Sequence, residues 1–196
     1  MRKSEWAASV GLMAQPRSRT GARGGIEHVQ LTTRDDVRRM AALGVRASVQ
    51  PAHLLDDRDV AERLWRGRAE RCFPLRWMFD DGVDVVLGSD APVSPLDPWL
   101  AAAAAVHRSA DEREPWSPRE ALTVTEALAA STDGITTLEA GGPGDLVLLD
   151  EHPLRGSSHL SAGGVTKGEG SDEAAARLRD TRPVATFVAG LLTHGT

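Results

Sequence analysis

The sequence contains a single cysteine, Cys72, among its 196 residues. One thiol cannot form an intrachain disulfide, and it cannot build a thiolate metal cluster within one chain. Long hydrophobic runs are also missing, because no stretch approaches the ~20 apolar residues that span a bilayer. We therefore expect neither a disulfide-stabilised fold nor a membrane-spanning helix.

Positive charge is scarce as well, since 23 Lys and Arg residues against 28 Asp and Glu residues give a net charge of −5. Nucleic acids and acidic membranes bind proteins whose basic residues neutralise phosphates. We therefore expect no nucleic-acid partner, no membrane partner and a cytoplasmic location. Residues 1–25 are rich in Arg, Gly and Ser and lack the apolar centre of a secretory signal, so they are predicted to be a disordered or non-native tail.

Among the features that are present, residues 83–99 are the most informative. The apolar run at 83–87 stops at Gly88, and Asp90 and several prolines follow. A short β-branched run of this kind is typical of a buried parallel strand, and active sites of α/β folds lie at the carboxyl ends of such strands. Asp90 is therefore a candidate catalytic residue. The same pattern also fits an aspartate that caps a turn or the next helix.

Two earlier segments repeat this pattern and alternate with predicted helices. Strands are predicted at 26–30, 45–50 and 83–87, and helices at 33–43, 56–71 and 74–79. This alternation produces a parallel sheet with right-handed crossovers. Polar side chains stand at or near the strand exits: His28, then Gln50 with His53, then Asp90. We expect His28 and Asp90 at the same end of the sheet, with His53 between them.

Beyond Asp90 the pattern changes. Helices are predicted at 98–107 and 118–130, and strands at 145–150 and 184–192, the last interrupted by Gly190. Residues 155–182 are rich in Gly, Ser and charge and are predicted to be a loose excursion with a short helix at 174–178. Asp97, before Pro98, fits a helix cap better than a catalytic residue.

Four motifs in order carry a resemblance to a known family: IEHVQ at 26–30, ASVQPAH at 47–53, LGSDAPV at 87–93 and LDP at 96–98. Together they resemble the C-terminal half of the amidohydrolase superfamily, and most of all the branch that contains N-substituted formamide deformylases. GDLVLLD at 144–150, Pro153 with Leu154, and residues 184–190 resemble strands of the small β-sandwich that this family adds beside its barrel. The resemblance covers residues 26–154 and 183–191.

The resemblance implies a (β/α) barrel whose sixth, seventh and eighth strands carry His28, His53 and Asp90. It implies hydrolysis of non-peptide C–N bonds in a small amide-type substrate, with a water activated by a divalent metal, expected to be zinc. His28 would be a metal ligand, and Asp90 would contact the metal or its water and move the proton. His53 and Gln50 would bind substrate. From the residues alone, His28 also fits a satisfied buried histidine, and His53 a surface position.

The chain departs from the family in its ligand set. The family's His-x-His pair and fifth-strand histidine are absent, whereas a catalytic zinc usually has three protein ligands. We expect an α/β fold with part of a TIM-type barrel at 26–135 and part of a β-sandwich at 136–196, present as a C-terminal fragment of the enzyme. The alternatives are a non-catalytic remnant, or a subunit that pairs with a separate chain supplying the missing strands. Unpaired strand edges also predict self-association.

Overall fold

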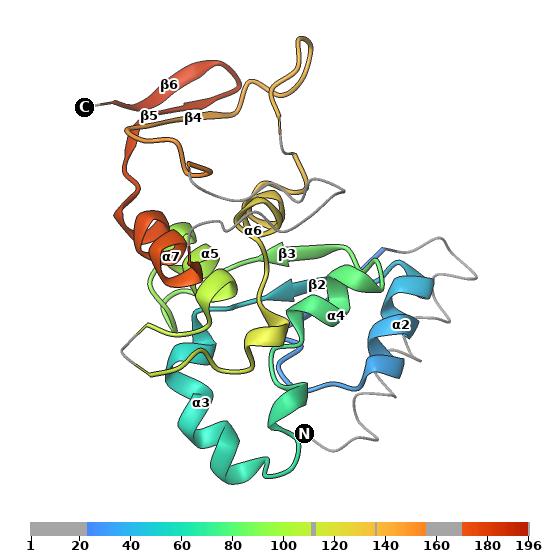
Figure 1. Ribbon diagram of the computed structural model, residues 1–196. Helices are drawn as coiled ribbons and strands as arrows, with labels where there is room; N and C mark the ends of the chain where they lie inside the picture. Colours follow the sequence, from blue (N-terminus) through green and yellow to red (C-terminus); the bar gives the residue numbers. More distant parts are fainter. Residues whose placement is uncertain (1–22, 111–112, 136, 156–169, 196) are drawn as a thin grey trace, which may run out of the picture.

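The computed structural model describes residues 23–110, 113–135, 137–155 and 170–195. Strands and helices alternate in the first half of the chain (Figure 1): β1 Gly25–Glu27, α2 Arg34–Leu43, β2 Arg46–Val49, α3 His53–Leu64, α4 Leu75–Asp80 and β3 Val85–Leu87. The later elements are α5 Pro98–His107, α6 Val124–Ser131, β4 Leu146–Leu149, α7 Ser171–Asp180, β5 Pro183–Val188 and β6 Leu191–Gly195. Short 3-10 helices lie at Ala69–Arg71 and Pro118–Glu120. None of the helices within these ranges is long and apolar enough to cross a bilayer.

The first three strands form a parallel sheet in the order β1-β2-β3, which confirms the predicted strand–helix alternation. Ala47 of β2 pairs with Ile26 on one side and with Val85 on the other. Helix α2 packs against β2, and α5 and α6 pack against β3. The main apolar core lies between the sheet and these helices, so the strands are held in fixed register and their carboxyl ends share one edge.

Helix α2 shows how local sequence sets the bounds of an element. The Thr33 hydroxyl accepts a hydrogen bond from the Asp36 N–H and so caps the first turn. Gly44 ends the helix with a left-handed φ of 57°, which glycine adopts without a steric penalty. Between these ends, Val37 and Met40 are fully buried. The predicted helix at 33–43 is confirmed within one residue.

A second apolar cluster anchors α3 beside the sheet. It consists of Leu54, Ala61, Cys72, Phe73 and Trp116. The fully buried Arg108 guanidinium donates hydrogen bonds to the backbone carbonyls of Trp116, Phe73 and Cys72. Burial lowers the pKa of Arg108 to about 10. Because three carbonyl groups depend on it, Arg108 holds the loops around α3 in place.

Helix α5 is enclosed on all sides. Ala101, Ala102, Ala103, Ala104 and Ala105 are between 0% and 2% exposed. Helix α7 lies beside α5 (Figure 1) and buries Ala174, Ala175 and Leu178 in the contact. The structure therefore differs from the loose excursion expected at 155–182, because residues 171–180 form a packed helix longer than the predicted 174–178. Residues 156–169 lie outside the described residues.

The remaining strands form an antiparallel sheet in the order β4-β5-β6, drawn at the top of Figure 1. The single strand expected at 184–192 is a hairpin, because Ala189 and Gly190 both have positive φ, 51° and 79°, and turn the chain back. Large apolar side chains of this sheet are more than half exposed: Val147, Leu148, Val188, Leu191 and Leu192. The part of the chain that the structure describes holds no second layer against those side chains, so the expected β-sandwich stays a prediction.

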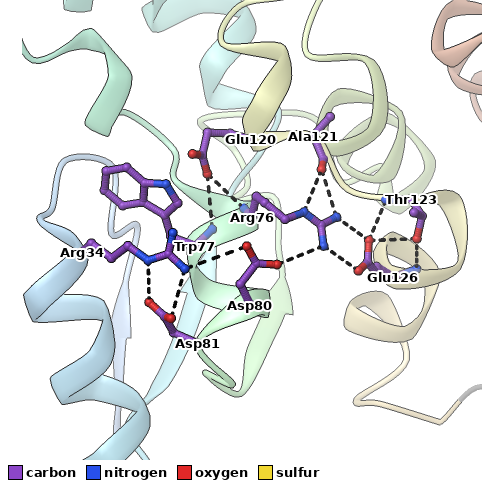
Figure 2. A network of polar contacts seen from close by, with 9 residues as sticks. All are labelled: Arg34, Arg76, Trp77, Asp80, Asp81, Glu120, Ala121, Thr123 and Glu126. Carbon is purple, nitrogen blue, oxygen red and sulfur yellow. Dashed lines mark hydrogen bonds and ion pairs between the residues drawn. The ribbon is translucent and has the colours of Figure 1, made fainter.

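A network of charged side chains, here called the arginine network, joins α2, α4 and α6 (Figure 2). Its members are Arg34, Arg76, Asp80, Asp81, Glu120 and Glu126. Arg76 donates to both carboxylate oxygens of Glu126, at 2.8 and 2.6 Å, and to the backbone carbonyl of Ala121. Glu120 accepts hydrogen bonds from the backbone N–H groups of Arg76 and Trp77.

Glu126 also fixes the start of α6. It forms a capping box with Thr123, so this helix begins at Val124 and not at the predicted Pro118, which opens a 3-10 helix. Burial alone would raise the pKa of Glu126. Hydrogen bonds from Arg76 and Thr123, with the positive charge of Arg76, outweigh burial and lower this pKa to about 2.

Candidate metal centre

Three strand exits bring three side chains together at the carboxyl edge of the parallel sheet. His28 directly follows β1, His53 is the first residue of α3 after β2, and Asp90 follows β3. One potential ligand atom from each lies within 4.8 Å of the other two. His28 and Asp90 are at the same end of the sheet, with His53 from the middle strand between their strands, as the strand pattern predicts.

The His28 and Asp90 side chains face each other at the opening of the cluster. The distance from His28 Nε2 to Asp90 Oδ2 is 3.8 Å, and the side chains are 44% and 42% exposed. An exposed pair at this distance contributes little to stability. Both residues adopt left-handed backbone conformations, with φ of 69° and 55°, and so does the buried Val29 at 47°. Residues other than glycine rarely adopt such angles, which cluster at functional sites.

His53 forms the inner side of the cluster and is only 7% exposed. Its ring stacks on that of His28, with 5.7 Å between centroids and 23° between planes. Its Nε2 atom is buried and has no hydrogen-bond partner. Leaving a buried polar atom without a partner costs about 1–3 kcal/mol, and such atoms call for a functional explanation.

Gln50 directly follows β2 and lies three residues before His53. It is 3% exposed. Its Nε2 donates to Glu27 Oε2 at 3.2 Å and to the Ser48 carbonyl at 3.4 Å, whereas its buried Oε1 has no partner. A Cβ placed on Gly88 would lie 3.8 Å from Gln50 Nε2. The amide therefore lies between the ends of β1 and β3, and a second unpartnered atom belongs to the same edge of the sheet.

One hydrogen bond connects the two histidine-bearing segments. Gln30 Nε2, two residues after His28, donates to Asp57 Oδ2 in α3 at 2.8 Å. His53 and Asp57 are four residues apart and therefore lie on one face of α3. The bond fixes the helix that carries His53 to the segment that carries His28. Sequence reasoning missed both Asp57 and Glu27, because nothing in their local patterns marks them.

The residues present fit a divalent metal ion. Imidazole nitrogens and carboxylate oxygens are ligands for zinc and for other first-row divalent ions. An ion that reached Nε2 of His53 would give this buried atom the partner that it lacks. Asp97 lies outside the cluster, since its Oδ1 accepts hydrogen bonds from the N–H groups of Trp99 and Leu100 and caps α5. This confirms the predicted capping role.

Comparison with known proteins gives the family. The amidohydrolase family model matches residues 5–192, so the chain belongs to the amidohydrolase family. The matched range is wider than the motifs at 26–154 and 183–191 that carry the resemblance.

Among curated proteins, the chain is similar to an N-substituted formamide deformylase of Arthrobacter pascens, with 29% identity over 184 residues, which is 86% of this chain and 30% of that protein. It is also similar to the putative amidohydrolase YtcJ of Bacillus subtilis, with 29% identity over 55% of this chain and 21% of that protein. Protein LONG AFTER FAR-RED 3 of Arabidopsis thaliana shares 36% identity over 55% of this chain and 19% of that protein. The chain thus spans less than a third of the length of these relatives.

Among solved structures, an uncharacterized metal-dependent hydrolase from Pyrococcus horikoshii superimposes with a TM-score of 0.54 and 28% identity. The match covers 63% of this chain and 26% of that one. That neighbour is described as a metal-dependent hydrolase, and the donor set at the sheet edge of this chain fits a divalent metal.

Proposed function

We propose that this chain carries part of the active site of a metal-dependent hydrolase that cleaves C–N bonds in small non-peptide amides. The observation that carries the proposal is the meeting of two imidazoles and a carboxylate at the carboxyl edge of the parallel sheet. The choice of bond rests on the deformylase, whose similarity extends over 86% of this chain.

His28 and Asp90 would hold the metal, with zinc as the expected ion. A divalent metal at such a site lowers the pKa of water and polarises the carbonyl group to be attacked. Asp90, on the half-exposed side of the cluster, is placed to accept a proton from water and to return it to the leaving nitrogen. Gln50, whose Nε2 is held by Glu27 and the Ser48 carbonyl and whose Oε1 is buried, would line the site behind the metal ligands.

The parallel sheet is proposed to be the last part of a barrel. In the described part of the chain, β1 and β3 are both edge strands of a sheet with the order β1-β2-β3. A parallel sheet is normally covered on both faces, and closure into a barrel removes its unpaired edges. Polypeptide that carries the remaining strands, together with the family's other histidines, would complete both the barrel and the site. Without it, the open edges would favour self-association.

The test is turnover of N-formyl and N-acyl amines by the chain alone and by the chain co-expressed with a polypeptide that carries the family's His-x-His and fifth-strand motifs. We expect metal-dependent turnover from the pair only, and its loss in His28→Ala and Asp90→Asn. His194→Ala, an exposed histidine of β6, is the matched control and should keep full activity.

Two outcomes would contradict the proposal. A folded pair that binds metal and hydrolyses no amide would rule out the proposed bond class. Turnover by the chain alone would show that the described strands catalyse the reaction without additional barrel strands.

A further inference from the structure

We infer that His53 is a third ligand of the metal, and not a substrate-contacting residue, so that His28, His53 and Asp90 form a three-donor site within this chain. The inference rests on the proposed function, because that function requires a bound metal. It goes beyond that function by making the middle strand a source of a metal ligand. It also supplies the number of protein ligands that a catalytic zinc usually has.

The distances support one ion shared by all three residues. Two donor atoms that each lie 2.0 to 2.2 Å from one ion can be at most about 4.4 Å apart. His28 and Asp90, at 3.8 Å, already meet this limit, and all three donor atoms lie within 4.8 Å of one another. Closing the remaining gap needs only a few tenths of an ångström, which the half-exposed side chains of His28 and Asp90 can supply.

Burial distinguishes a ligand from a substrate contact. A residue that contacts substrate must present its polar atom to the space that the substrate enters. His53 is 7% exposed and its Nε2 is closed off from solvent, beneath the more exposed ring of His28. A ring nitrogen of His53 nevertheless lies within 4.8 Å of a donor atom of each of the other two residues, a spacing that a single ion can bridge with small side-chain shifts.

The backbone around His53 is fixed in the way that a ligand requires. The His53 N–H donates to the Gln50 carbonyl at 3.1 Å. One turn later, Asp57 accepts the hydrogen bond from Gln30 that joins α3 to the segment after His28. The two imidazoles are therefore held relative to each other before any ion binds, and such preorganisation favours binding.

The experiment is a titration of the full chain with Co²⁺, followed by visible absorption. We expect His53→Ala to weaken Co²⁺ binding by at least about tenfold, and we expect His28→Ala to do the same. His194→Ala, an exposed histidine of β6, should change the affinity less than twofold. Unchanged affinity in a folded His53→Ala variant, checked by circular dichroism, would overturn the inference.

A measurement on the unmodified chain covers the case in which His53→Ala does not fold. In the proton NMR spectrum of the Co²⁺-loaded chain, two ligating histidines predict two strongly shifted exchangeable imidazole N–H signals; a single such signal would overturn the inference. The two proposals can fail separately. If metal binding depends on His53 but no amide is hydrolysed, only the proposed reaction is refuted. If amides are hydrolysed but the metal affinity does not depend on His53, only the assignment of His53 as a metal ligand is refuted.

Discussion

Two groups of polar side chains pack against the apolar core. One is the arginine network, and the other, here called the strand-end cluster, consists of His28, Gln50, His53 and Asp90. In the arginine network the polar groups are satisfied. The buried Glu120 accepts from two backbone N–H groups, and the partly buried Arg76 donates to two carboxylate oxygens and a carbonyl. In the strand-end cluster, His53 Nε2 and Gln50 Oε1 are buried without a partner. Satisfied polar groups rigidify a fold, whereas unsatisfied ones leave capacity for a ligand.

The comparison predicts that damage to the arginine network affects stability and leaves metal binding intact. Glu126→Ala removes the partner of Arg76 and the capping box of α6, so the free energy of unfolding should fall by about 2–3 kcal/mol in urea titrations. The Co²⁺ affinity of the folded fraction should not change. The exposed Glu139→Ala is the control and should stay within about 0.5 kcal/mol. An equal loss of metal affinity in Glu126→Ala would show that the two clusters are coupled.

A smaller effect is expected from acid. The pKa of Glu126 is about 2 in the folded protein against an ordinary value of 4.5, so its stabilising contribution is complete above pH 4.5 and is lost as pH falls toward 2. The hydrogen bond from Arg34 lowers the pKa of Asp81 and adds to the same trend. Burial raises the pKa of Glu120, so this group acts above pH 4.5, where its protonation increases the free energy of unfolding as pH falls toward 4.5.

The free energy of unfolding should therefore decrease between pH 4.5 and pH 2, as measured by urea titration at each pH. Glu126→Gln should flatten this decrease, whereas Glu120→Gln should leave it unchanged and alter the profile above pH 4.5 instead. A pH profile of Glu126→Gln that superimposes on that of the unmodified chain would show that Arg76 does not depend on this carboxylate.

The smallest effect concerns the strand-end cluster. Asp57→Ala removes the hydrogen bond from Gln30, so Co²⁺ affinity should fall about three- to tenfold while stability changes by at most about 1 kcal/mol. Asp57→Asn keeps an acceptor and should restore most of the affinity. The exposed neighbour Asp56→Ala is the control. Equal losses at positions 56 and 57 would show that charge near α3, and not the bond to Gln30, sets the affinity.

Features set by short stretches of chain could be predicted from the sequence. Thr33 and Gly44 bound α2 by capping chemistry, and Asp97 caps α5 for the same reason. The meeting of His28 and Asp90 also followed from the sequence, because apolar runs located their strands and parallel strands share a carboxyl edge.

Features that depend on register or on competing local signals could not be predicted. The stacking of His53 on His28 depends on α3 beginning at His53, three residues earlier than the helix predicted at 56–71. The bond between Gln30 and Asp57 joins residues whose proximity depends on how α3 packs. At α6, two start signals compete, and the capping box of Thr123 prevails over Pro118 because Arg76 holds Glu126 in place.

The enclosure of α5 limits how this part of the chain can evolve. A helix with one face in water admits large side chains at every third or fourth position, so substitutions accumulate there with a helical period. In α5, residues 101–105 are all at most 2% exposed, and the helix packs against β3, α6 and α7. Adding even a few methylene groups to such a site costs about 1–3 kcal/mol. We therefore expect only small residues to be accepted at these five consecutive positions. Substitutions that are tolerated every third or fourth residue, the usual sign of a helix in a set of variants, should be absent here.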